Sequence, residues 1–172
     1  MLRLDDRWVW DAWTVDDGGR THLFYLQAPR SLGDPSLRHV NATVGHAVST
    51  DCVDWEVVED ALTPSDSGCD DLAIWTGSTM HDGERWRMFY TAVSRAGHHI
   101  YDQRIGSAVS DDLVHWTRVS SEPALRIDLT EVTSVDAQGR ACLEALHRMG
   151  AQFVAADCLM KAVVAEITGG RS

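Results

Sequence analysis

The sequence repeats the stretch Val44-Gly-His-Ala-Val-Ser-Thr-Asp-Cys-Val-Asp-Trp55 as Ile105-Gly-Ser-Ala-Val-Ser-Asp-Asp-Leu-Val-His-Trp116, 61 positions later. A second correspondence lies upstream, where Leu23-Phe-Tyr25 returns as Met88-Phe-Tyr90 after 65 positions. A period of about 60 residues means that one supersecondary unit occurs more than once along the chain. The fold of this region therefore depends on the structure of one unit and on how its copies pack.

Each copy predicts a four-stranded antiparallel meander, because short runs of aromatic and β-branched residues alternate with turn clusters. Asp16-Asp-Gly-Gly19 and His81-Asp-Gly-Glu84 are predicted hairpin turns, since Asp-Gly supplies the positive φ of a tight reversal. Four strands in about 60 residues are typical of a β-propeller blade, and an eight-stranded sandwich is the alternative. The predicted strands are Trp8–Thr14, His22–Gln27, Thr43–Ser49 and Trp55–Val58, then Ala73–Met80, Trp86–Val93, Arg104–Ser110 and Trp116–Ser120.

The periodicity changes after Ala124. A strand is expected over Leu125–Val132, and a helix capped by Asp136 follows with one apolar face. A further strand, Gln152–Ala156, precedes a second helix that begins at Asp157. We therefore expect a mainly β chain with a C-terminal β-α-β-α segment, divided into a two-blade region at 1–122 and an α/β region at 123–172.

Composition narrows the choice of partners. The chain has 15 basic and 26 acidic residues, and the resulting net charge of −11 argues against nucleic acid or an anionic membrane as partner. No apolar run approaches the length of a membrane span, and the first residues lack the apolar core of a signal peptide, so a cytoplasmic protein is expected. The four cysteines form no Cys-x-x-Cys pair, and neither a metal site nor a cofactor is expected.

Trp8-Val-Trp-Asp-Ala-Trp13 opens the first unit, and Trp75-Thr-Gly-Ser78 opens the second. Together with the Ser-x-Asp-x-x-x-Trp segments Ser49–Trp55 and Ser110–Trp116, these motifs resemble the five-bladed β-propeller glycoside hydrolases of families 32, 43, 62 and 68. This is the invertase, levansucrase and arabinanase group. The resemblance covers about residues 5–122 and implies a carbohydrate substrate of the fructoside or arabinoside type.

The resemblance also implies a site. The family has a catalytic carboxylate on the innermost strand of blade one, a position that corresponds to Asp11. That carboxylate attacks the anomeric carbon or activates water opposite an oxocarbenium-like transition state. Trp10, Trp13 and Trp75 are candidates to stack on sugar rings, and Ser78 is a candidate for a hydrogen bond to the substrate. Alternatively, the tryptophans fill a blade interface and Asp11 bonds a neighbouring turn.

Three other aspartates are interpreted structurally. Asp51 and Asp112 each precede a tryptophan by four residues, and a shared turn-capping role is favoured over catalysis for both. Asp70, next to Asp71 before the second unit, is expected in a solvated loop.

Part of the family pattern is missing. Glycoside hydrolysis needs a second carboxyl group to protonate the leaving oxygen, and the family's Arg-Asp-Pro element should open a third blade. Arg126-Ile-Asp128 lacks the proline, and nothing around Glu122 or Glu131 supports either as the acid. The sequence thus predicts a truncated glycosidase-like protein with an incomplete catalytic set, or else a non-catalytic remnant that binds carbohydrate or protein. Two blades would also leave open edges that invite self-association.

The C-terminal segment, about residues 124–170, is similar to the later half of a STAS domain, the anti-sigma-factor-antagonist fold. Leu125–Arg140 and Leu146–Ala155 carry this similarity. The family's phosphorylatable serine follows an aspartate, but here Ala137 follows Asp136. A regulatory interaction module and a generic β-α-β-α packing module are both compatible with this segment.

Overall fold

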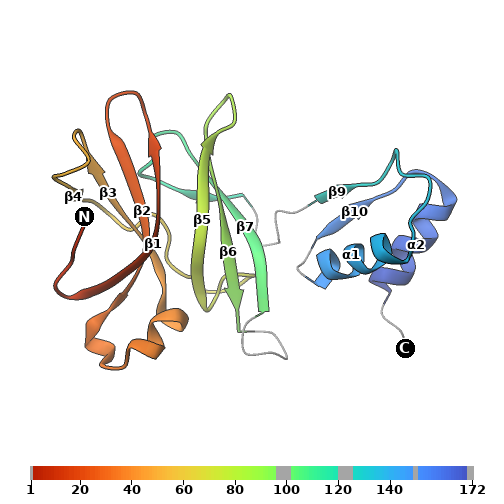
Figure 1. Cartoon of the computed structure of the whole chain (residues 1–172), viewed down its shortest axis with the longest axis horizontal. Coiled ribbons are helices and arrows are strands. Elements are labelled where there is room, and N and C mark those ends of the chain that lie inside the picture. Colours follow the sequence, from red (N-terminus) through yellow and green to blue (C-terminus); the bar gives the residue numbers. More distant parts are fainter. Residues whose placement is uncertain (1, 96–101, 120–125, 149–150, 170–172) are drawn as a thin grey trace. The chain divides into compact units, whose positions relative to one another are not determined.

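The computed structural model describes residues 2–95, 102–119, 126–148 and 151–169. The chain divides into two compact units, Met1–Glu122 and Pro123–Ser172 (Figure 1). The first unit is built from β-sheets and the second combines short strands with helices, so the chain is mainly β with an α/β segment at its C-terminal end, as the sequence predicts.

The first unit consists of two four-stranded antiparallel meanders, the blades expected from the repeat. The first blade has the order β1-β2-β3-β4, and the second has the order β5-β6-β7-β8. Two 3₁₀ helices, η1 (Arg30–Leu32) and η2 (Pro35–Asn41), connect β2 to β3. The strands are β1 (Arg7–Asp16), β2 (Thr21–Pro29), β3 (Thr43–Ser49), β4 (Glu56–Val57), β5 (Ala73–His81), β6 (Trp86–Ser94), β7 (Asp102–Ser110) and β8 (Thr117–Arg118).

The fourth strand of each blade is shorter than predicted, with two residues in β4 and two in β8. In the first blade, the segment that follows β4 also pairs with β3. The amide of Val44 donates to the carbonyl of Leu62 at 2.8 Å, and the amide of Ala61 donates to the carbonyl of Val44 at 2.8 Å. The segment after β4 therefore takes over pairing with the start of β3.

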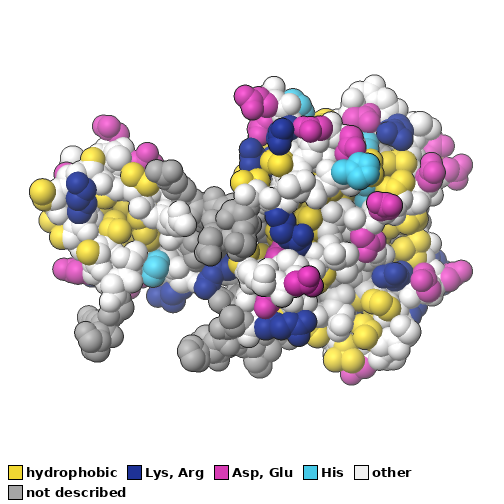
Figure 2. All heavy atoms as spheres, turned by 180° about the vertical axis from the view of Figure 1, so that it is seen from behind, with side chains coloured by type: hydrophobic (Ala, Val, Ile, Leu, Met, Phe, Trp, Pro, Cys, Tyr) yellow, Lys and Arg dark blue, Asp and Glu magenta, His cyan; other side chains and the backbone are white. Residues whose placement is uncertain are grey.

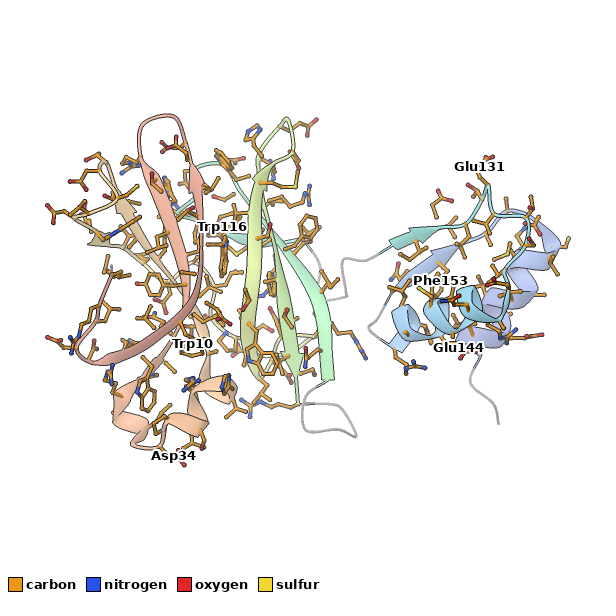
Figure 3. The ribbon with its side chains drawn as sticks, in the orientation of Figure 1. Trp10, Asp34, Trp116, Glu131, Glu144 and Phe153 are labelled. Atoms are coloured by element: carbon orange, nitrogen blue, oxygen red, sulfur yellow. The ribbon has the colours of Figure 1, made fainter. Side chains whose placement is uncertain are left out.

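Successive side chains point to opposite faces of a strand, so each blade has two faces. We call them the tyrosine face, after Tyr25 and Tyr90, and the phenylalanine face, after Phe24 and Phe89. The core of the first unit forms where the phenylalanine face of the first blade packs against the tyrosine face of the second. Trp116 lies in this core, 5.7 Å from Phe24 between ring centroids (Figure 3). Further members of the core are Trp13, Val15, Leu26 and Val44 from the first blade and Ile74, Met88, Ala92 and Ala108 from the second.

The glycine that follows Val44 and Ile105 in the repeat has a packing role. A Cβ atom added at Gly45 would overlap the ring of Tyr25, and one added at Gly106 would overlap the ring of Tyr90. In both blades the tyrosine ring lies flat over the facing strand, which only glycine permits. The repeated Val/Ile-Gly pair thus encodes the close contact between the second and third strands.

The Ser-x-Asp-x-x-x-Trp segments form matching turns, which confirms the capping role expected for their aspartates. The Asp51 carboxylate accepts hydrogen bonds from the amides of Val53 and Asp54, each at 2.9 Å. Asp112 accepts equivalent bonds from Val114 at 2.9 Å and His115 at 2.8 Å. These are local side-chain-to-backbone bonds that compete with strand pairing and so end the third strand.

The second unit contains β9 (Arg126–Asp128), α1 (Ala137–Arg148), β10 (Gln152–Val154) and α2 (Cys158–Thr168), with β9 and β10 parallel. This confirms the β-α-β-α order, although β9 ends earlier than predicted because Asp128 bonds the amide and hydroxyl of Thr130. Asp157 caps α2, accepting from the amide of Met160 at 2.9 Å. The core is made by Leu129, Leu143, Met160 and Ile167, with Phe153 packed against it (Figure 3). The STAS similarity stays a prediction.

Within the described ranges, no helix is long and apolar enough to cross a membrane. Acidic side chains are spread over the surface of the first unit, and hydrophobic side chains reach the surface among them (Figure 2).

Candidate active site

Asp11 lies in a β-bulge on the innermost strand of the first blade. The pairing of β1 with β2 shifts register between Trp10 and Ala12, and Asp11 is the extra residue, with φ 43°. For most residues other than glycine, this left-handed backbone costs roughly 1–2 kcal/mol, and aspartate and asparagine tolerate it best. Bulges re-aim side chains and are common next to active sites, so the strained conformation singles out Asp11 among the exposed aspartates.

The second blade has the same bulge at the equivalent place. Its β5–β6 pairing shifts register between Trp75 and Gly77, so Thr76 corresponds to Asp11. The Thr76 hydroxyl donates a hydrogen bond of 3.0 Å to Oδ2 of Asp11. The two bulges therefore meet, and the first strands of the two blades are joined where the carboxylate is exposed.

Helix η2 connects the two candidate tryptophans beside Asp11. The imidazole of His39 lies edge-on to Trp10, with ring centroids 5.9 Å apart, and edge-on to Trp75 at 6.2 Å. The indole Nε1 of Trp75 donates to the His39 carbonyl at 2.7 Å. The guanidinium of Arg38 lies over the Trp10 ring, 5.5 Å from its centroid, within the range of a cation–π contact.

Sequence reasoning did not identify this contribution of η2. The signal was present at the start of the helix, where Asp34 accepts from the amide of Ser36 at 2.8 Å and Pro35 occupies the first turn. An Asp-Pro pair marks a helix start. The Asp-Pro pair does not predict that the helix contacts residues of both blades.

The structure places the other two candidates away from this cluster. Trp13 lies in the core between the blades, where its indole stacks on Phe24 and its Nε1 donates to Thr79 at 3.0 Å. This environment matches the alternative in which Trp13 fills a blade interface. Ser78 is exposed opposite Phe89, on the face of the second blade that points away from the first. Of the predicted set, Trp10, Asp11 and Trp75 are brought together.

Asp11 and Trp10 line a surface hollow of about 410 Å³, whose other lining residues are Leu2 of the N-terminal segment and residues of the first blade. Among the residues that the structure describes, Asp11 is the only carboxylate in its lining. Of the two glutamates considered as the acid, Glu122 lies outside the described residues and Glu131 is exposed in the second unit. The side chain of Asp128 bonds Thr130.

A buried polar chain runs through the first blade. Nδ1 of His22 lies 2.9 Å from Nε2 of His46, and Nε2 of His22 lies 3.1 Å from a carboxylate oxygen of Asp17. Both imidazoles are fully buried. Burial, together with the neighbouring His22 and Arg20, lowers the pKa of His46 to about 4. Hydrogen bonds from the amides of Arg20 and Gly19 and from His22 lower the pKa of Asp17 to about 2.

A second polar cluster corrects the prediction for Asp70, which is not in a solvated loop. Its side chain is 2% exposed and accepts hydrogen bonds from the Tyr90 hydroxyl at 2.8 Å and from Nε of Arg118 at 2.6 Å, as well as from Ser65. Burial and the Asp70 carboxylate raise the pKa of Tyr90. Sequence reasoning missed this group because Arg118 lies 48 positions from its partner.

The sequence of residues 14–137 matches the model of the glycosyl hydrolase family 32 N-terminal domain. This match spans more than two thirds of the chain. The chain belongs to glycoside hydrolase family 32. Asp11 lies three residues before the matched segment, so its assignment rests on its place in the first strand rather than on the match itself.

The curated relatives of this family 32 chain are named as enzymes that act on fructans or fructofuranosides. A fructan 1-exohydrolase of Triticum urartu is 36% identical over 126 residues, covering 69% of this chain and 19% of that protein. A cell-wall isozyme of beta-fructofuranosidase from Pisum sativum is 29% identical over 110 residues, covering 63% of this chain and 19% of that protein. The chain thus spans about a fifth of the length of these relatives.

Solved structures agree on the fold. The fructofuranosidase of Schwanniomyces occidentalis in complex with fructose superposes with a TM-score of 0.56 at 21% identity, over 71% of this chain and 25% of that one. The fructan 1-exohydrolase IIa of Cichorium intybus gives a TM-score of 0.54 at 22% identity, over 68% of this chain and 21% of that one. The two meanders of the family 32 domain are therefore blades of a β-propeller.

Proposed function

We propose that this family 32 domain recognises the fructosyl group of a fructoside and that Asp11 is its nucleophile. The observation that carries the proposal is the strained, exposed carboxylate of Asp11 on the innermost strand, held by Thr76 and flanked by Trp10. The names of the relatives support a fructoside over the arabinoside alternative.

In the proposed step, an Asp11 carboxylate oxygen forms a bond to the anomeric carbon while the bond from that carbon to the leaving oxygen breaks. The leaving oxygen takes the electron pair and ordinarily needs a proton from a second carboxyl group. Asp11 is the only carboxylate lining the hollow in the described part of the chain, so natural fructosides should turn over slowly or not at all. A substrate whose leaving group needs no proton bypasses this requirement.

The test uses a nitrophenyl fructoside, which releases nitrophenolate without protonation. We expect a burst of nitrophenolate and an intact protein mass increased by one fructosyl group, located on Asp11 by peptide mapping. Asp11→Asn should abolish both signals. Asp34→Asn is the matched control, because Asp34 is also exposed but caps η2, and it should leave both signals in place.

Absence of the fructosyl adduct in a folded protein that still releases nitrophenolate would contradict the nucleophile role. The second candidate function is carbohydrate binding without catalysis, which the single carboxylate of the hollow favours. It predicts that fructose quenches tryptophan fluorescence equally in the native protein and in Asp11→Asn, with no release of nitrophenolate in either.

Three expectations stay predictions: cytoplasmic location, a STAS-like regulatory role of the second unit, and self-association.

A further inference from the structure

The hollow beside Asp11 extends over the tyrosine face of the first blade. Residues of β1, β2 and the turn after β3 form its apolar wall. They are Val9, Ala12, Leu23, Tyr25, Cys52 and Trp55.

The internal repeat shows what the tyrosine face binds in the second blade. With offsets of 65 and 61 positions, the equivalents of these lining residues in the second blade are Ile74, Gly77, Met88, Tyr90, Leu113 and Trp116. All of them except Gly77 belong to the core that the second blade forms with the phenylalanine face of the first. Even the backbone agrees, since Cys52 has φ 59° and Leu113 has φ 64°. The wall of the hollow therefore has the composition and backbone of a blade-binding surface.

The tyrosines of the two equivalent faces differ in their polar contacts. Tyr25 is fully buried, and its hydroxyl has no hydrogen-bond partner among the residues that the structure describes. Its equivalent, Tyr90, donates to Asp70 at 2.8 Å. A buried donor without an acceptor is unfavourable, so the polar part of this interface in the second blade has no counterpart in the first.

The complementary surface lies on the second blade of the same chain. Its phenylalanine face exposes Met80 by 51% and Phe89 by 37%. Their equivalents in the first blade, Val15 and Phe24, pack against the tyrosine face of the second blade. The same face also carries the hydroxyl of Ser78, directly opposite Phe89 on the neighbouring strand. The chain thus has both halves of an interface that its own two blades form with each other.

We propose that the tyrosine face of the first blade binds the phenylalanine face of the second blade of another copy. The contact is heterologous, joining two different surfaces head to tail, so it extends to a ring or to a filament. Because Asp11 and Trp10 line the hollow, the bound copy would form the wall of the site next to the carboxylate. The proposal rests on packing alone and does not depend on the proposed hydrolysis.

Two charge substitutions test the proposed association between copies. The molar mass is measured by light scattering coupled to size-exclusion chromatography over a range of concentrations. Leu23→Glu blocks the tyrosine face of the first blade, and Phe89→Glu blocks the phenylalanine face of the second. We expect the native chain to have a mass above the monomer, and each variant alone to be monomeric. An equimolar mixture of the two variants should form a dimer, because each retains the surface that the other has lost.

Leu159→Glu is the matched control, since Leu159 is 57% exposed on α2, and it should associate like the native chain. Recovery of the dimer in the mixture also demonstrates that both variants fold. Should Leu23→Glu lose the circular dichroism of the native chain, Val9→Glu on the same wall takes its place. A native chain that is monomeric at every concentration, or a mixture of folded variants that stays monomeric, would overturn the proposal.

Discussion

The two blades share a backbone plan but differ in how their buried polar groups are satisfied. Both have a bulge in the first strand, a tyrosine lying over a glycine, and an aspartate-capped turn after the third strand. In the second blade the Tyr90 hydroxyl is bonded to Asp70, whereas in the first the Tyr25 hydroxyl and Nδ1 of His46 have no partner within the described part of the chain. The comparison teaches that the repeat preserves shape and packing, and that each blade has its own polar chemistry.

The strongest contrast concerns Asp70 and its equivalent Asp5. Asp70→Asn removes the charge that Arg118 and Tyr90 share, so we expect a loss of about 3 kcal/mol in the free energy of unfolding. Asp5→Asn is the matched control, because Asp5 is exposed, and should change it by less than about 0.5 kcal/mol. Urea denaturation measures both. Equal losses of unfolding free energy in the two variants would mean that the buried Asp70 cluster contributes no more to stability than the exposed Asp5.

Acidic pH should destabilise the first blade by protonating His46. Its folded pKa of about 4 lies below the ordinary 6.5, so the neutral form stabilises the fold above pH 6.5 and that contribution is lost as the pH falls toward 4. Between pH 7 and 5 we expect a loss of about 2 kcal/mol from this group. The pH dependence of urea denaturation should flatten in His46→Gln and persist in His115→Gln, whose imidazole is exposed.

The tyrosines offer a smaller and more local contrast. Tyr90→Phe leaves the buried Asp70 without one of its donors and should cost about 1–2 kcal/mol. Tyr25→Phe removes a hydroxyl that has no partner among the described residues and should be neutral or slightly stabilising. Thermal unfolding of the two variants side by side distinguishes them, and a clear loss for Tyr25→Phe would show that its hydroxyl is bonded after all.

The smallest expected effect lies where the two bulges meet. Thr76→Val removes the hydrogen bond to Asp11 while preserving the branched shape of the side chain. Because both residues are exposed, we expect less than about 1 kcal/mol in urea denaturation. A larger loss would mean that this bond holds the blades together rather than only orienting the carboxylate.

The sequence was sufficient wherever local chemistry decides the structure. The repeat predicted both meanders, Asp-Gly predicted both hairpins, and Asp157 predicted the start of α2. It was not sufficient where distant residues decide. The burial of Asp70 depends on Arg118, and the imidazole pair joins His22 to a residue 24 positions away. Asp11 was found by resemblance, but its bulge depends on the register with β2, which no short-range pattern reports.

The left-handed backbone at Asp11 also determines which mutations this position can accept. Glycine adopts φ 43° freely and asparagine does so at little cost, whereas valine, isoleucine and threonine are excluded by steric clash at Cβ. Natural substitution of Asp11 should therefore run through asparagine or glycine before any branched residue appears. The bulge would in this way preserve a visible trace of the proposed catalytic position in descendants that have lost the carboxylate.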